Sequence, residues 1–230
     1  MPTTARRLMV GNILVLETST EVGSVAMACD GTVVGELSFS SRDPVTGART
    51  EALGPAVAKC LALTSTSPRD LAAVVCGAGP GGFTSLRSAA ALAKGLCSAL
   101  HIPLYAVSSL EILAWSAAVP NGRFIAALSA GRNEWFGADV NCEDGRAAIV
   151  SAAYLVGDED LRARAGRLHA RLIGPRLGID VTPRSGAAIP HLDEIEARGA
   201  TNVDSWEPTY GRLAEAQVKW EAVHGRPLSA

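Results

Sequence analysis

The chain has 230 residues, of which 48% are hydrophobic and 5% are aromatic, and its formal net charge at pH 7 is −2. This composition excludes a disordered chain and predicts one large or two small domains with a core of small aliphatic side chains. The balanced charge argues against a protein that grips nucleic acid through bulk electrostatics.

The cysteines form no C-x-x-C pair and are odd in number, which is typical of buried thiols in a reducing compartment rather than of disulfides or zinc sites. They are Cys29, Cys60, Cys76, Cys97 and Cys142. Glu17 and Glu21 interrupt the apolar run near the N-terminus, so we expect no secretory signal. No apolar run reaches the about 20 residues of a membrane span, and we expect a cytoplasmic protein.

The first elements predicted along the chain are three antiparallel strands. Residues 12–17 are nearly all apolar, as in a central strand buried on both faces. Residues 22–29 and 32–39 follow, and the Asp30-Gly31 pair between them is a strong hairpin signal. A helical pattern then runs from Thr50 to about Leu63. Because proline at position 55 is well tolerated only in a first turn, the helix either starts near Leu53 or is kinked.

A glycine-rich loop then follows a predicted strand at 72–76 and opens a helix that runs to about residue 100. Gly79, Gly81 and Gly82 lack a Cβ, and Thr84 and Ser85 place hydroxyls where the first helical N–H groups lack partners. The pattern fits either an anion site or a tight turn with a capped helix, and both interpretations stay open. It contains neither G-x-G-x-x-G nor a Walker lysine.

Both helices of this region are apolar over more than one stripe, which predicts that they pack against something besides their own sheet. We favour a protein partner over burial by the second half of the chain. The side chains assigned to this contact are Leu53, Val57, Cys60, Leu86, Ala90, Ala93 and Cys97.

A strand is expected at 103–107, followed by a helix on which Ser108 and Glu111 would form a capping box. A break at residues 121–122 is followed by a second strand–turn–strand unit. We divide the chain into lobes 1–107 and 108–230, which places the helix after residue 107 with the second unit. A helix from Asp158 starts with acids and ends with three arginines, as the helix dipole favours, although contact with RNA is an alternative. These arginines are Arg162, Arg164 and Arg167. A final helix carrying Leu213, Gln217 and Trp220 is expected to dock on the body.

Several of these segments together resemble one family. They are residues 14–20 (LVLETST), 49–53 (RTEAL), 79–87, 93–96 (AKGL), 102–111 and the Pro208-x-Tyr210-x-Arg212 neighbourhood. The sequence resembles the bacterial TsaB family, the non-catalytic partner of TsaD in making threonylcarbamoyladenosine in tRNA. The resemblance is dense over residues 13–114 and thin afterwards.

The resemblance implies two actin-like (ASKHA, ribonuclease H-like) lobes with mixed sheets and flanking helices. It implies binding to TsaD, homodimerisation in some members, docking of the ATPase TsaE, and contact with tRNA only through the complex. It implies no cofactor of the chain's own, with ATP or ADP bound only at the complex interface. On this basis the glycine loop, with Thr84, Ser85 and Arg87, is an anion or interface site.

The chain departs from the family pattern at four positions. The family usually has Asp where Glu17 stands, His where Arg49 stands, Ser where Gly82 stands and Gly where Ser85 stands. These changes leave the expected fold intact and bear on any nucleotide contact.

The main alternative is an ATP-dependent phosphotransferase of small molecules, since actin-like lobes often hold ATP. Glu17 would then position Mg²⁺, and Thr18, Ser19 and Thr20 would form a phosphate loop, which we otherwise interpret as vestigial. The four histidines contain no H-x-x-x-H pair, so we expect no metal site and no catalytic residue. The sequence also lacks the G-x-S-x-G of serine hydrolases.

Overall fold

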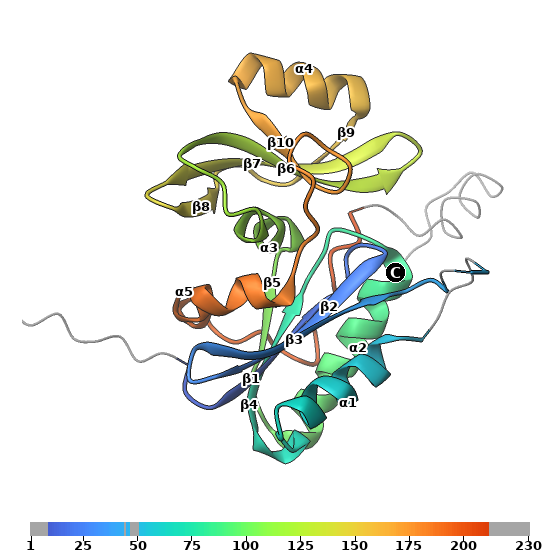
Figure 1. Ribbon diagram of the computed structural model, residues 1–230, viewed down its shortest axis with the longest axis vertical. Helices are drawn as coiled ribbons and strands as arrows, with labels where there is room; N and C mark the ends of the chain where they lie inside the picture. Colours follow the sequence, from blue (N-terminus) through green and yellow to red (C-terminus); the bar gives the residue numbers. More distant parts are fainter. Residues whose placement is uncertain (1–8, 44, 47–50, 212–230) are drawn as a thin grey trace, which may run out of the picture.

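Two β-sheets with flanking helices form the protein, as a computed structural model shows for residues 9–43, 45–46 and 51–211 (Figure 1). The first sheet has the strand order β3-β2-β1-β4-β5, and the second has the order β10-β6-β7-β8, with β9 also paired to β7. The predicted final helix around Trp220 lies outside the described residues.

The first sheet begins with the antiparallel meander that the sequence predicted, and two parallel strands extend it on the β1 side. Its strands are β1 (Asn12–Glu17), β2 (Val22–Cys29), β3 (Thr32–Ser40), β4 (Leu71–Gly77) and β5 (Leu104–Val107). Asp30 and Gly31 both have positive φ, 49° and 78°, as the tight turn between β2 and β3 requires.

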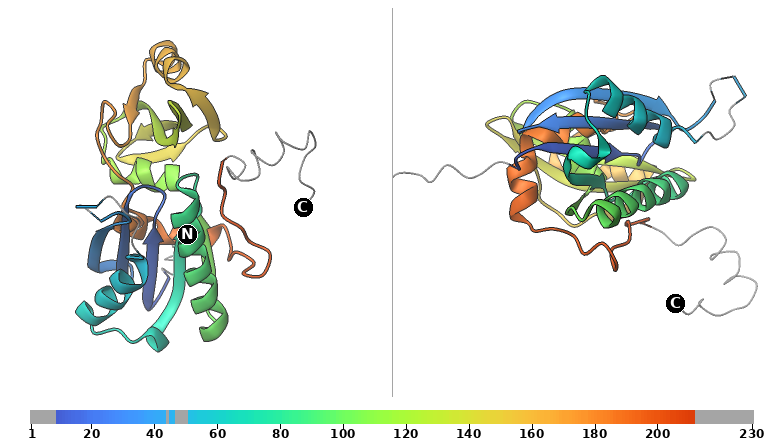
Figure 2. Two further views of the ribbon diagram at one scale, coloured as in Figure 1. Left: turned by 90° about the vertical axis from the view of Figure 1, so that its right-hand side faces the viewer. Right: turned by 90° about the horizontal axis from the view of Figure 1, so that it is seen from below.

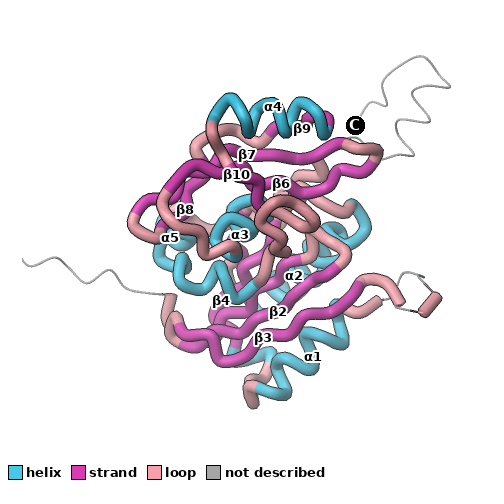
Figure 3. Tube along the Cα trace, turned by 45° about the horizontal axis from the view of Figure 1, so that its top comes forward, coloured by secondary structure: helices cyan, strands magenta, loops and turns pink. Residues whose placement is uncertain are grey.

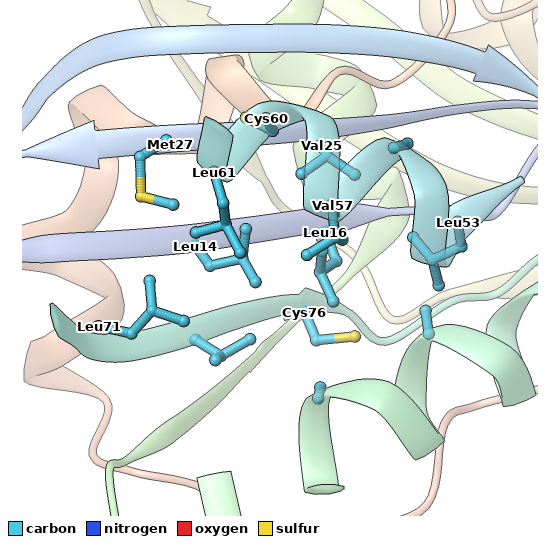
Figure 4. Close-up of a cluster of buried hydrophobic side chains, with 14 of the residues drawn as sticks. Leu14, Leu16, Val25, Met27, Leu53, Val57, Cys60, Leu61, Leu71 and Cys76 are labelled. Atoms are coloured by element: carbon cyan, nitrogen blue, oxygen red, sulfur yellow. The ribbon is translucent and has the colours of Figure 1, made fainter. Parts of the chain in front are cut away.

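Helices cover both faces of the first sheet (Figures 1 and 2). One face packs against α1 (Leu53–Leu63) and α2 (Phe83–Leu100). The cluster between them contains leucines and cysteines such as Leu14, Leu16 and Cys76 (Figure 4). The other face packs against the 3₁₀ helix η2 (Ser185–His191) and α5 (Leu192–Ala197), which the sequence did not predict. A short 3₁₀ turn, η1 (Pro68–Asp70), leads into β4.

The second sheet is likewise covered on both faces, by α3 (Ser109–Ser116) and by α4 (Asp158–Leu168) (Figure 3). Its strands are β6 (Gly122–Gly131), β7 (Glu134–Glu143), β8 (Arg146–Ile149), β9 (Tyr154–Gly157) and β10 (Arg171–Ile173). Residues alternate along β6, so that Phe124 faces α3 and Ile125 faces α4.

The capping box predicted at the start of α3 is wrong. Ser108 is the N-cap residue, but its side chain accepts no capping hydrogen bond. Glu111 instead accepts two hydrogen bonds from Arg198, at 2.7 and 2.8 Å. The Glu111 carboxylate, which the local pattern assigned to the cap, therefore forms a long-range ion pair with Arg198.

After β10 the chain returns to the first sheet. Ser185 donates hydrogen bonds to Ser24 on β2, and Thr201 forms an antiparallel β-bridge with Leu104 on β5. The division into lobes 1–107 and 108–230 stays a prediction, and the structure adds that residues 185–206 pack on the first sheet. No helix among the described residues is long and apolar enough to cross a membrane.

Candidate functional site

The glycine loop joins β4 to α2 and is held from both sides. Gly79 has a positive φ of 84°, and a Cβ there would lie 2.3 Å from the carbonyl oxygen of Thr209. The Gly79–Pro80 peptide is cis. On the other side, Ser109 at the start of α3 donates its N–H to the Gly79 oxygen at 2.8 Å. The loop therefore needs glycine at position 79 for both conformation and space.

The turn after β1 lies directly against this loop. The N–H of Gly82 donates to the carbonyl of Ser19 at 2.8 Å, and the Thr18 hydroxyl donates to the carbonyl of Ser85 at 3.0 Å. A Cβ on Gly81 would lie 2.4 Å from the Ser19 carbonyl oxygen. The two predicted segments, 17–20 and 79–87, are thus brought together by the fold.

Glu17 is buried at this junction, with 1% of its surface exposed. One carboxylate oxygen accepts from the Ser19 N–H at 2.6 Å, and the other accepts from the Ser109 hydroxyl at 2.9 Å. Burial raises the pKa of Glu17 above its ordinary 4.5, and these hydrogen bonds offset only part of that effect. Glu17 therefore ties β1 to α3, and both of its carboxylate oxygens accept hydrogen bonds from the chain itself.

A hollow lies between the starts of α1 and α2, and it gathers part of the predicted site. Its walls carry hydroxyls from the turn after β1, from the residue that follows β3 and from α2, together with one carboxylate. The lining residues are Thr18, Thr20, Gly23, Phe39, Ser41, Glu51, Ala52, Leu53, Thr84, Ser85 and Ser88. Both helices begin there without a side-chain cap, so the hollow offers hydroxyl and N–H donors.

Other predicted residues lie away from this hollow. Gly79, Gly81 and Ser19 are covered by chain, as described above. Arg87 is exposed and lies over the ring of Phe83, with its guanidinium carbon 5.2 Å from the ring centroid. Sequence reasoning missed Phe39, Ser41 and Ser88, because only the folding of β3 and α2 around the turn brings them to the hollow.

The side chains that the sequence assigned to a partner face the chain's own core instead. All seven are buried: Leu53, Val57, Cys60, Leu86, Ala90, Ala93 and Cys97, none more than 7% exposed. Most of them pack in the cluster between these helices and the first sheet. This corrects the residue assignment, because a partner that binds α1 and α2 must meet the opposite faces of the helices.

Those opposite faces are lined by small residues. The exposed glycine and alanine positions are Gly54, Ala58 and Ala62 on α1 and Ala91, Gly95 and Ala99 on α2. We call these six residues the small-residue face. A Cβ added at Gly54 or Gly95 would meet no atom within 4 Å. The face therefore has room for another backbone or for larger side chains.

A segment from residue 199 to 210 passes beside α2 and reaches the glycine loop. Lys94 donates to the carbonyl of Trp206 at 2.9 Å, and Tyr210 packs against Phe83 with ring centroids 4.5 Å apart. The N–H of Thr209 donates to the carbonyl of Ala78 at 2.7 Å. Within this segment, the sequence singled out only the residues around Tyr210. In the structure these residues lie next to the glycine loop.

The described histidines serve structural contacts. His101 and His169 end α2 and α4 in the left-handed conformation, with φ of 55° and 50°. His191 stacks on Trp115 with ring centroids 4.0 Å apart. Within the described ranges, no group of three or more histidine, cysteine or acidic residues is placed to hold a metal ion.

Comparison with known proteins adds to this geometry. The family model described as TsaD, tRNA N6-adenosine threonylcarbamoyltransferase, matches residues 45–158. The tRNA threonylcarbamoyladenosine biosynthesis protein TsaB of Escherichia coli K12 is 35% identical over 129 residues, which are 55% of this chain and 54% of that protein. The matched region thus spans about half the length of this relative.

The Bacillus subtilis protein of the same name is 28% identical over 227 residues, which cover 90% of this chain and 97% of that protein. The chain is thus similar to a TsaB protein over nearly its whole length. The solved structure of YeaZ from Pseudomonas aeruginosa has a TM-score of 0.72 at 24% identity, covering 87% of this chain and all of that one. This likeness confirms the actin-like fold expected of a TsaB protein.

Proposed function

We propose that this chain acts in forming threonylcarbamoyladenosine in tRNA, as a non-catalytic subunit that binds and stabilises a TsaD-like catalytic partner. Curated TsaB relatives are named for biosynthesis of this nucleoside, which supports the pathway. The buried Glu17, with both oxygens hydrogen bonded inside the chain, supports a structural role for the one carboxylate that the sequence offered for catalysis.

The observation that carries the binding role is the small-residue face. Small side chains on two adjacent helices let another helix approach closely, and charges are sparse there. The core side of the same helices is filled by the chain itself, which holds the face rigid. A rigid surface of small side chains favours a stable protein interface.

The proposal includes two further partners and a nucleotide. A second copy of the chain would compete for the small-residue face, so homodimer and heterodimer would exclude each other. A TsaE-like ATPase would dock on the assembled pair. The hollow between the starts of α1 and α2 contains a carboxylate, Glu51, and among the described residues no lysine or arginine lines it. ATP or ADP would therefore need cations from the partner and would bind only at the interface.

Charged substitutions on α2 test the interface when the full-length chain is mixed with its TsaD-like subunit. Ala91→Glu and Gly95→Arg place charges on the small-residue face and should abolish co-elution in size-exclusion chromatography. Ala163→Glu on α4 is the matched control, since that position is also exposed and helical. Ala93→Glu, by contrast, buries a charge at a position with 0% exposure and should unfold the chain.

The melting temperatures of the first three proteins should stay near that of the unmodified chain. If Ala91→Glu and Gly95→Arg co-elute with the partner as well as Ala163→Glu does, the interface is elsewhere. Modified-nucleoside content of tRNA from cells that carry each variant gives the functional readout. Normal threonylcarbamoyladenosine in cells lacking the chain would contradict the proposed function itself.

A further inference from the structure

Three arginines lie near one end of the second sheet. Arg171 begins β10 and is paired with Phe124 on β6, and Arg123 precedes Phe124 in the chain, so its side chain leaves the opposite face of the sheet. Adjacent strands are about 4.8 Å apart. Arg167 is in the last turn of α4, four positions before Arg171, where the helix leads into β10 (Figure 1). We call Arg123, Arg167 and Arg171 the arginine rim, and all three are exposed.

The arginine rim has no carboxylate partners among the described residues, unlike the other arginines of the second lobe's helix. Arg162 is paired with Asp158, and Arg164 is paired with Asp139. Of the three arginines that the sequence grouped together, two are thus occupied. The fold instead brings Arg167 close to Arg171, which begins the strand that follows α4, and to the end of β6 that carries Arg123.

One guanidinium of the rim is held in place. The Arg171 guanidinium carbon lies 5.0 Å from the centroid of the Phe124 ring, and Phe124 is itself 2% exposed. Arginine stacked on an aromatic ring keeps its N–H groups free to bind phosphate. The helix dipole explains Arg167 at the end of α4, but it does not explain Arg123 or Arg171, which lie on strands.

Acidic residues on the neighbouring hairpin do not cancel this charge. Glu143 and Asp144 lie near the start of β6, because Gly122 pairs with Cys142 on β7. Glu143 accepts a hydrogen bond from the Asn141 side chain at 2.8 Å. Arg146 follows on the same hairpin, so the arginines outnumber the carboxylates at this end of the sheet.

We propose that the arginine rim binds the phosphate backbone of the tRNA substrate. The inference rests on the proposed function, which supplies an RNA substrate, while the rim supplies unpaired cations suited to phosphates. The rim is on the second sheet, whereas α1 and α2 cover the first (Figures 1 and 2). The chain can therefore hold the catalytic partner and the RNA at the same time. The family resemblance, by contrast, implied contact with tRNA only through the complex.

The test measures binding of a fluorescently labelled, unmodified tRNA transcript to the full chain paired with its TsaD-like subunit, over a range of salt concentrations. Arg167→Gln should weaken binding several-fold, and each lost phosphate contact should reduce the slope of log K against log salt by about 0.7–0.9. The triple variant Arg123→Gln/Arg167→Gln/Arg171→Gln should reduce this slope by about 2. Arg69→Gln, an exposed arginine on η1 in the first lobe, is the matched control and should change neither quantity.

Pair formation is followed separately by size-exclusion chromatography. If the triple variant forms the pair and binds the transcript with unchanged affinity and salt slope, the RNA assignment is wrong and the proposed function stands. If the triple variant no longer forms the pair, the rim is a protein interface and the RNA assignment is again wrong. If the unmodified chain forms no pair, the proposed function fails. Arg167 is exposed on α4, so its variant gives a result even if Arg171→Gln disturbs folding.

Discussion

The glycine loop offers a sharp test, because two adjacent glycines should differ strongly in how much stability the same substitution costs. At Gly81 an added Cβ would lie 2.4 Å from the backbone oxygen of Ser19 and 2.5 Å from its Cβ. At Gly82 the nearest atom to an added Cβ is 3.7 Å away, which is ordinary contact. Both positions belong to one turn, so the change in chain entropy is nearly the same for each.

Gly81→Ala should lower the free energy of unfolding by about 2–4 kcal/mol. Overpacking against backbone costs about 1–3 kcal/mol, and displacing Ser19 also weakens the Gly82-to-Ser19 hydrogen bond by about 1 kcal/mol. For a chain of this size, each kcal/mol shifts the melting temperature by about 2–4 °C, so the loss should be about 4–16 °C.

Gly82→Ala should change stability by less than about 1 kcal/mol, because the backbone there has φ of −61° and the site is open. Gly82→Ser places an N-cap hydroxyl on α2 and should add a few tenths of a kcal/mol, roughly the difference between serine and glycine caps. Urea and thermal unfolding of the three variants give the comparison. Equal stability of Gly81→Ala and Gly82→Ala would refute the close packing of the loop on Ser19.

Two further changes test buried polar contacts. Glu17→Gln should stabilise the fold at pH 7, because burial raises the pKa of Glu17 in the folded chain. The unmodified chain should therefore lose stability as the pH rises from 4.5 through this raised pKa, whereas the variant should not lose it. Urea titrations at several pH values measure this, and an identical pH dependence in both proteins would contradict it. Arg164→Ala should cost about 1–3 kcal/mol, since it deprives the half-buried Asp139 of its ion pair. Arg162→Ala, whose pair is solvent-exposed, should lower the melting temperature much less in the same thermal assay, and equal losses would count against the burial argument.

The sequence predicted the first sheet well because its signals are local. The apolar run at 12–17, the Asp30-Gly31 turn and the proline limit on α1 each act within a few residues. The buried faces of α1 and α2 were also visible as a period of three to four. Periodicity shows which face of a helix is apolar but not what covers it, and so the core face was assigned to a partner.

Features that depend on distant residues could not be predicted. Helices η2 and α5 are short, and Pro190 lies within one of them, so neither shows a helical period. Glu111 is taken from its expected cap by Arg198, 87 positions away. The hollow at the start of α2 likewise needs β3 and α1 to fold around the same turn.

The return of the chain to its first sheet has a consequence for synthesis on the ribosome. Helices η2 and α5, which cover one face of that sheet, follow the whole second sheet in the sequence. Ile13, Val15 and Ala26 on that face therefore stay open to water until residues near 195 have been made. The N-terminal sheet is the first to be synthesised and among the last to be sealed, which gives a chaperone or a folding partner a defined interval in which to act.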